Sequence, residues 1–276
     1  MGNNINDGYA DSNRFSDKAL LIYNDFLHSG KFLTHYKWLK NAAETYDIKL
    51  ELMGNSEFLC SYGTSFDKEL IETLGKYRFI LFWDKDIRLG KKFTNICKKI
   101  NIPIYNNIRA IADCDDKSAT YEKIGQWNDC HDTLEQIKMI PTIVAPMTYE
   151  NIGYTDMNFL DKVAEKFGFP LVIKECFGSF GMQVYMAHDM DELKKRVSDI
   201  GGKPMIFQKF IEKSSGFDVR LQVVGDEVVA AMYRYTDDGD FRANITHGGK
   251  MKSYEPDASE IKLATDTVKA LGLCRS

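Results

Sequence analysis

The sequence predicts an α/β protein in which strands and helices alternate along the chain. Short apolar runs such as 77–83 (YRFILFW) have the length and composition of buried strands. Segments such as 91–100 separate these runs and place their apolar residues three or four positions apart, which is typical of amphipathic helices. Strands that alternate with helices indicate a parallel sheet in a layered fold.

This alternation occupies residues 16–112, the first predicted domain. A polar stretch at 1–15, rich in Asn and Asp, precedes it and is predicted to be a disordered lead-in. The apolar runs predict the strands, and the helical spacing of apolar residues predicts the helices between them. We expect strands at 19–23, 48–52, 77–83 and 103–105, and helices at 32–46, 66–74 and 91–100.

A second domain is predicted over 113–276, where the order of elements changes. Its first part, 113–204, is expected to contain helices at 118–124, 159–167 and 189–200, and strands at 142–146, 171–175 and 183–186. Its second part, 205–276, is expected to contain strands at 205–211, 218–224 and 227–235, and a helix at 259–271. Gly225 and Asp226 predict a tight hairpin between two of these strands.

Composition narrows the class of protein. Of the 276 residues, 44% are hydrophobic and 28% are charged, which excludes disorder over most of the chain. The net charge is -4, and Lys and Arg alternate with Asp and Glu, so no basic stripe for nucleic acid stands out. No apolar run approaches the roughly 20 residues that a membrane span needs. We therefore expect neither a nucleic-acid nor a membrane partner.

The six cysteines indicate a reducing compartment. No two of them have C-x-x-C spacing, so a zinc ribbon or a redox motif is not supported. The start of the sequence does not have the pattern of a secretory signal. We expect a cytoplasmic protein with free thiols.

The first sequence feature that indicates a binding site is a predicted strand that carries a lysine, followed by a glycine loop. Glycines let backbone N–H groups approach a phosphate, and lysine supplies a positive charge for it. The pattern is neither a P-loop nor a dinucleotide fingerprint. A hairpin turn that needs positive φ would give the same glycines, so the loop alone leaves both interpretations open. The candidate nucleotide-binding residues are Lys174, Gly178, Ser179, Phe180 and Gly181.

Lysines 174 and 117 differ in how far the sequence supports a role in binding. Lys174 lies on a strand predicted to be buried, where an unpaired lysine is rare, and the alternation of side chains directs Glu175 to the opposite face. This favours a function for Lys174. Lys117 follows two aspartates and could simply mark the start of a helix.

Arginines gather in the second part of the domain. Asp218 and Arg220 share one face of a predicted strand, Arg234 lies on the next strand, and Arg242 and Lys250 follow. Clustered arginines need anionic partners, and transferring phosphates are the natural candidates. The candidate catalytic residues are therefore Arg220, Arg234 and Arg242.

A series of short motifs follows in a fixed order along the second domain. The motifs are D-D-K at 115–117, I-P-T-I at 140–143, V-I-K-E at 172–175, G-S-F-G at 178–181, Q-K-F-I at 208–211, D-V-R at 218–220, F-R-A-N at 241–244 and H-G-G at 247–249. Taken in order, these motifs resemble the RimK-type ATP-grasp ligases, the alpha-L-glutamate ligase group, from about residue 108 to the end. The resemblance implies a Rossmann-like pre-ATP-grasp domain followed by an ATP-grasp fold, in which two α+β subdomains clasp ATP.

The resemblance also implies roles for the residues. Lys117 and Lys174 would contact the phosphates of ATP, and Asp218 would lie near the ribose. Within the segment Gln208, Lys209, Phe210 and Ile211, the backbone of Lys209 and Phe210 would face the adenine. Arg242 would clamp the terminal phosphate with Asn244 in the same site, and Arg220 would face the phosphates or an acyl phosphate. The loop 178–181 would be a mobile lid that excludes water.

The expected cofactors are ATP and Mg²⁺, with Mn²⁺ as a substitute for the metal. In the family the metal ligands are an Asp in a G-V-D-type strand and an E-x-N motif, and the sequence ends at Ser276 before either motif. We therefore expect the C-terminal part of the fold to be incomplete and assign no metal ligand. Asp237, Asp238 and Asp240 are interpreted as a solvated turn.

Three functions remain open from the sequence. The first is an ATP-dependent ligase that joins a small-molecule or peptide carboxylate to an amine such as glutamate or another amino acid. The second is a non-catalytic ATP-binding relic or fragment without a metal site. The third is another ATP-grasp chemistry, such as carboxylation or phosphotransfer. A homo-oligomer is compatible with the sequence, which does not decide the oligomeric state.

Overall fold

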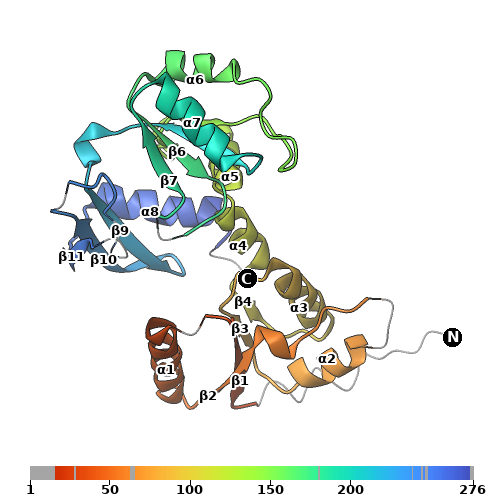
Figure 1. The fold of residues 1–276 in the computed structure, drawn as a ribbon. Coiled ribbons are helices and arrows are strands. Elements are labelled where there is room, and N and C mark those ends of the chain that lie inside the picture. The colour runs from red at the N-terminus through yellow and green to blue at the C-terminus, as the bar shows by residue number, and fades with distance from the viewer. Residues whose placement is uncertain are drawn as a thin grey trace. The chain divides into compact units, whose positions relative to one another are not determined.

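The computed structural model describes residues 16–27, 29–62, 66–179, 181–237, 239–243, 245 and 248–273, with Phe66 described by its backbone alone. The predicted lead-in at 1–15 lies outside these residues. The chain divides into two compact units, of which the first ends at Ala112 and the second begins at Asp113 (Figure 1). No helix in the described part is long and apolar enough to span a membrane.

The first unit contains a parallel four-stranded sheet, which confirms the prediction from alternating strands and helices. The strand order is β2-β1-β3-β4, and every pair is parallel. The strands are β1 (Lys18–Tyr23), β2 (Lys49–Gly54), β3 (Ile80–Phe82) and β4 (Ile104–Tyr105). The helices are α1 (Gly30–Glu44), α2 (Phe66–Leu74), α3 (Ile87–Lys99) and α4 (Ile108–Asp115), with a short 3-10 turn at Asn55–Glu57.

The central strand β1 explains why this sheet needs helices on both faces. Residues 19–22 of β1 are completely buried. Leu20 belongs to the core cluster that contains Phe93 of α3, whereas Leu21 belongs to the cluster that contains Tyr36 of α1. A strand covered on both faces is apolar at successive positions rather than at every second one. The run ALLI at 19–22 is this pattern.

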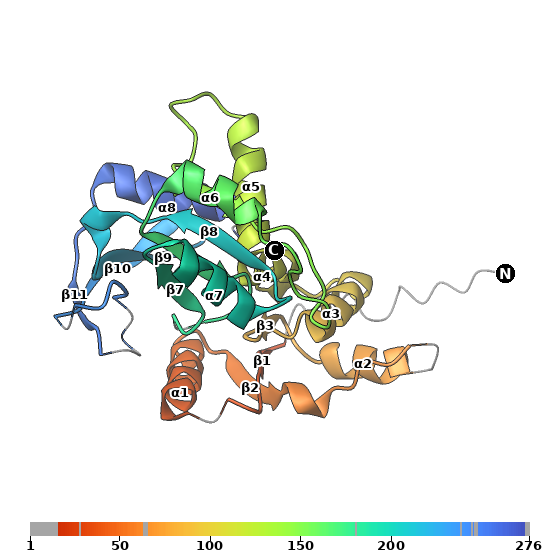
Figure 2. The ribbon, with the colours of Figure 1, turned by 45° about the horizontal axis from the view of Figure 1, so that its top comes forward.

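The second unit opens with an antiparallel sheet of order β5-β8-β6-β7. Helices α6 and α7 lie against one face of it (Figure 2), and α5 lies against β8. Ile173 and Phe207 are completely buried in the cluster under α6 and α7. The elements are α5 (Lys117–Asp129), β5 (Thr142–Val144), α6 (Phe159–Phe167), β6 (Leu171–Glu175), β7 (Val184–Ala187), α7 (Met190–Ile200) and β8 (Met205–Lys209).

A 3-10 turn at Glu212–Ser214 leads into a second antiparallel sheet of order β11-β10-β9. The predicted hairpin joins β9 to β10, and Gly225 adopts the positive φ of +64° that such a turn requires. Helix α8 packs against both β9 and β10 and against α5. The elements are β9 (Phe217–Val224), β10 (Glu227–Tyr235), β11 (Lys250–Ser253) and α8 (Ala258–Ala270).

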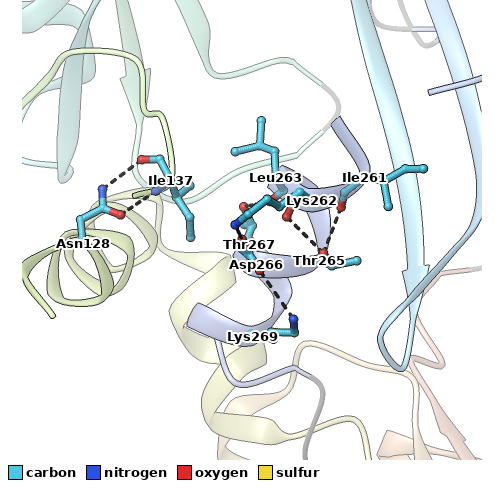
Figure 3. A network of polar contacts seen from close by, with 9 residues as sticks. All are labelled: Asn128, Ile137, Ile261, Lys262, Leu263, Thr265, Asp266, Thr267 and Lys269. Carbon is cyan, nitrogen blue, oxygen red and sulfur yellow. Dashed lines mark hydrogen bonds and ion pairs between the residues drawn. The ribbon is translucent and has the colours of Figure 1, made fainter. Parts of the chain in front are cut away.

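Polar contacts stabilise the loop after α5 and helix α8 (Figure 3). The side chain of Asn128, near the end of α5, donates to Ile137 O at 2.9 Å and accepts from Ile137 N at 2.7 Å. On α8, Asp266 forms ion pairs with Lys262 and Lys269, the latter at 3.6 Å. Ile137 also belongs to a small apolar cluster with Leu271, which follows α8. Through this cluster the loop after α5 packs against the end of α8.

Several elements differ from the sequence predictions. Helix α3 begins at Ile87 rather than at 91, because Asp86 caps it by accepting from Leu89 N at 3.0 Å. Helix α5 begins at Lys117, after the cap Asp116, and continues to Asp129 rather than ending at 124. The strand predicted at 77–83 is shorter in the structure, where β3 covers only Ile80–Phe82. The sequence analysis predicted neither α4 nor β11, and β11 (KMKS) is exposed along its whole length, so it has no apolar pattern.

Truncation of Leu20 tests the core of the first unit. Because Leu20 is completely buried, Leu20→Ala is expected to lower the free energy of unfolding of this unit by about 2–5 kcal/mol. The matched control is Leu59→Ala, where the side chain is 84% exposed and the expected change is within about 0.5 kcal/mol. Urea unfolding followed by circular dichroism measures both, and equal losses in the two variants would contradict the assignment of β1 to the core.

Candidate functional site

The second unit contains a cleft of about 540 Å³. Its walls come from the start of α5, from β6 and the loop that follows it, from the end of β8, and from β9 and the segment after β10. Most of the residues predicted from the sequence line this cleft together. They are Lys117, Lys174, Gly178, Ser179, Gly181, Gln208, Lys209, Phe210, Ile211, Asp218, Arg220 and Arg242.

The strand register sets the order of side chains along the cleft. Val172 of β6 lies opposite Gln208 of β8, and Lys174 lies opposite Ile206. All four therefore share one face of the sheet, and Lys174 lies about 6.5 Å further along β6 than Val172. Apolar lining residues accompany Val172 near the end of β8, namely Ile140, Phe210 and Ile211. The cleft thus has an apolar end at β8 and a cationic end at Lys174 and the glycine loop.

Lys174 is the charged centre of the cationic end. Burial lowers the pKa of its ammonium group, and the nearby charge of Lys117 lowers the pKa further. No residue of the described part forms a hydrogen bond or an ion pair with this side chain. Glu175 points to the opposite face, as predicted, where it accepts from Tyr185 Oη at 3.0 Å and pairs with Lys203 at 3.3 Å. The cleft therefore contains a positive charge that no described residue neutralises.

Lys117 contacts the backbone of the glycine loop. Its Nζ donates to Glu175 O at 3.0 Å, to Cys176 O at 3.1 Å and to Gly178 O at 3.4 Å. Asp116 fixes the position of Lys117 by capping α5, since its Oδ1 accepts from Ser118 N at 2.8 Å. Lys117 is thus both the first residue of a helix, as the structural interpretation held, and a cation at the cleft.

The loop after β6 needs glycine at Gly178. Its φ is +137°, and a Cβ atom there would lie 2.4 Å from Gln183 Oε1. This oxygen is buried and has no hydrogen-bond partner among the described residues. Gly181 also has a positive φ, of +77°, and its carbonyl accepts from Arg242 Nη1 at 3.2 Å. Both ends of the loop therefore contact cations of the cleft.

Arg242 is held by Asp240, which corrects part of the sequence interpretation. Arg242 Nη2 lies 2.7 Å from Asp240 Oδ2, and the two side chains are only 26% and 22% exposed. Asp240 is thus a partly buried ion-pair partner rather than part of a solvated turn. Asp237 does lie at the surface, paired with Lys250, and Asp238 lies outside the described residues.

Arg234 differs from the other predicted arginines because it does not line the cleft. It lies directly opposite Asp218 on the neighbouring strand, and its Nε and Nη2 donate to the two carboxylate oxygens at 2.7 and 2.5 Å. Arg220 does line the cleft, where burial and the charge of Arg234 lower the pKa of its guanidinium group. The pair of Asp218 and Arg234 therefore supports the wall, and Arg220 supplies the charge that faces the cleft.

Two predicted residues, Phe180 and Asn244, lie outside the described part, as does His247. The structure adds cleft residues to which the sequence analysis assigned no role in the site, namely Ile140, Val172, Gln183, Val184, Ser214, Phe217, Phe241 and Ala243. Gln183 follows the glycine loop by two positions, so its place on the returning strand was a usable signal. The sequence alone could not distinguish the apolar lining residues from the many other apolar residues that only build the core.

The described residues contain no group of three or more His, Cys, Asp or Glu side chains that could hold a metal ion. Mg²⁺ prefers carboxylate oxygens together with phosphates and water. Asp218, which lines the cleft, is paired with Arg234, and Asp240, which lies beside the lining residue Arg242, is paired with that arginine. The described residues therefore do not form a magnesium site, and no protein ligand is assigned among them.

Comparison with known proteins finds similarity along most of the chain. The RimK-like ATP-grasp domain matches residues 128–275. An uncharacterized protein of Mycoplasma pneumoniae is 29% identical over 256 residues, which is 91% of this chain and 82% of its own length. A probable alpha-L-glutamate ligase of Trichodesmium erythraeum is 40% identical over 108 residues, 38% of this chain and 36% of its own.

The fold has solved counterparts. The RimK domain ATP-grasp protein of Sphaerobacter thermophilus has a TM-score of 0.62 and 16% identity, over 93% of this chain and 83% of that one. These findings confirm the fold class, an ATP-grasp architecture. Because the family match covers more than half of the 276 residues, the chain belongs to the RimK-like ATP-grasp family. ATP-grasp ligases of this kind use ATP and Mg²⁺ and join carboxylates to amines.

Replacement of Lys174 separates a binding role from a structural one. Because its charge is partly buried without a described partner, Lys174→Met is expected to raise the free energy of unfolding at neutral pH by about 0.5–2 kcal/mol. The wild-type chain binds fewer protons at this site when folded than when unfolded. Its stability should therefore rise toward that of the variant as the pH increases from the lowered pKa of Lys174 toward the ordinary 10.5.

Urea unfolding at several pH values measures this difference. Lys166→Met, at an exposed position on α6, is the matched control and should change stability by less than about 0.5 kcal/mol. A loss of stability in Lys174→Met would show that Lys174 supports the fold.

Proposed function

We propose that this chain is an ATP-dependent carboxylate–amine ligase and that the cleft of the second unit binds the ATP. The observation that carries the proposal is Lys174, a partly buried ammonium group without a described partner, next to the glycine loop and Lys117. A partly buried cation of this kind is stabilised by an anionic ligand. The triphosphate of a nucleotide supplies such an anion.

The order of side chains along the cleft supports one orientation of the nucleotide. The base would lie at the apolar end, against Ile140, Val172 and the hinge at 209–211. The ribose would lie toward Asp218, and the triphosphate would extend along β6 to Lys174. Arg220 and Arg242 would face the terminal phosphate from the other wall.

The contacts of the loop support its role as a lid. Lys117 and Arg242 now hold the carbonyls of Gly178 and Gly181. When a nucleotide enters, its phosphate oxygens would take over part of these contacts, because an ionised acceptor forms the stronger hydrogen bond. The loop would then settle over the phosphates and exclude water, which would otherwise hydrolyse a reactive intermediate.

The reaction we propose has two steps. A carboxylate oxygen of the substrate attacks the terminal phosphorus of ATP, and the bond to the bridging oxygen breaks, which gives an acyl phosphate and ADP. An amine then attacks the acyl carbon and expels phosphate, which gives an amide after loss of a proton. Lys174, Arg220 and Arg242 would stabilise the charge that develops on the transferred group. Bound Mg²⁺, or Mn²⁺ in its place, would neutralise phosphate charge.

We propose an amino acid, with glutamate as the first choice, as the amine or as part of the acceptor. The support is the similarity to a probable alpha-L-glutamate ligase. We place the protein in the cytoplasm with neither a nucleic-acid nor a membrane partner. The five cysteines in the described part are all free thiols, which suits that compartment.

Calorimetric titration with MgATP tests the nucleotide site. We expect binding by the wild-type chain, and a loss of at least about tenfold in affinity for Lys174→Ala and for Arg242→Ala, since charge-assisted hydrogen bonds contribute about 1.5–3 kcal/mol each. The matched control is Lys166→Ala, which removes an exposed lysine of α6 and should bind ATP like the wild type.

Release of ADP with a panel of carboxylates and amino acids then tests catalysis. Turnover that depends on both a carboxylate and an amine would support the ligase. ATP binding without turnover for any pair would favour a non-catalytic nucleotide-binding protein. A folded wild-type chain that binds no ATP would contradict the proposed site.

A further inference from the structure

The first unit contains a cavity of its own, of about 290 Å³, which lies apart from the cleft of the second unit. Its walls come from the end of β2, from the segment 57–61 that follows this strand, and from helices α2 and α3. The volume is close to the lower end of the range for small-molecule sites. The chemistry of the walls therefore indicates which kind of small molecule fits.

One part of the wall is apolar and continuous with the core. Four apolar residues line it and either belong to the core of the first unit or pack against it, namely Met53, Phe58, Leu70 and Leu89. The ring of Phe58 lies edge-on against the completely buried Phe93, with the ring centroids 5.0 Å apart. An apolar group in the cavity would thus displace water from a surface whose position the core already fixes.

The positive charge of Lys92, which also lines the cavity, is neutralised within the protein. Its ammonium group pairs with Asp67, donates to Ser61 O at 3.2 Å and lies 4.9 Å from the centroid of the Tyr62 ring. The side chain is only 11% exposed. An acidic ligand would have to compete with Asp67 for this lysine, so Lys92 gives the cavity little attraction for anions.

Two carboxylates at the entrance of the cavity are not neutralised. Glu57 and Glu69 both line the cavity, and both are exposed. No described residue forms an ion pair with either side chain, although Glu57 Oε1 accepts from Gly54 N at 2.9 Å. The cavity therefore combines an apolar interior with a negatively charged entrance.

We infer that this cavity binds a small organic cation, a primary amine that carries an apolar body. The body would lie against Met53 and Phe58, and the ammonium group would lie at the entrance, near Glu57 and Glu69. A carboxylate of the same length would instead meet two like charges. The inference goes beyond the proposed ligase and does not rest on the nucleotide site of the second unit.

The experiment compares hexylamine with hexanoate, which have equally long carbon chains and opposite charges at neutral pH. Each is titrated into the whole chain labelled with ¹³C at the methionine methyl groups, and the Met53 signal is identified by its loss in Met53→Leu. We expect hexylamine to shift this signal and to bind about fivefold or more tightly than hexanoate, because two exposed ion pairs add to the contact of the apolar body.

Glu69→Gln and Glu44→Gln form the matched pair. Glu69→Gln keeps the size of the side chain and removes the charge, so it should weaken hexylamine binding by about two- to fivefold. Glu44 is exposed on α1, which packs on the opposite face of the sheet, and Glu44→Gln should bind hexylamine like the wild type.

The outcomes are independent of the ATP titration. Equal affinities for the two compounds, a preference for hexanoate, or equal binding by the two glutamine variants would overturn the inference. So would a Met53 signal that neither compound shifts. A chain that prefers hexylamine but binds no ATP would contradict the proposed function and leave this site in place.

Discussion

The candidate site of the second unit depends on one ammonium group, that of Lys174, which the fold holds on strand β6. Water would solvate Lys174 better than the cleft does, and this cost is expressed in its lowered pKa. The fold tolerates the cost because β6 is paired on both sides, with β7 and β8, and cannot move the lysine outward. Such preorganised charge is worth more to a phosphate than a charge that must first leave solvent.

Other cations of the cleft are held differently, and the difference divides the site into fixed and exchangeable parts. Arg234 is bound to Asp218 across two strands, so its charge belongs to the wall. Lys117 and Arg242 donate to loop carbonyls, which are neutral acceptors and bind a cation less strongly than an ionised group does. The cleft therefore combines cations fixed by carboxylates with cations that contact the backbone of the loop or no described residue.

The sequence predicted those parts of the fold that have local signals. Aspartate caps and apolar spacing predicted α7 close to its observed bounds, and the Gly-Asp turn predicted the hairpin of β9 and β10. It could not predict β11, whose exposed residues have no periodicity, because that strand exists through its pairing with β10. The partner of Arg234 was equally hidden, since Asp218 lies opposite it only through strand register.

The alternation of side chains on β6 has a consequence for the whole cleft. Lys174 and Glu175 are neighbours in sequence, but one faces the cleft and the other lies behind the sheet with Tyr185 and Lys203. A slip of one residue in the pairing of β6 would exchange them, because successive side chains point to opposite faces. The sign of the charge on this face of the sheet is thus a property of strand register, and inserting or deleting a single residue before Lys174 would place a carboxylate in the cleft where the ammonium group now lies.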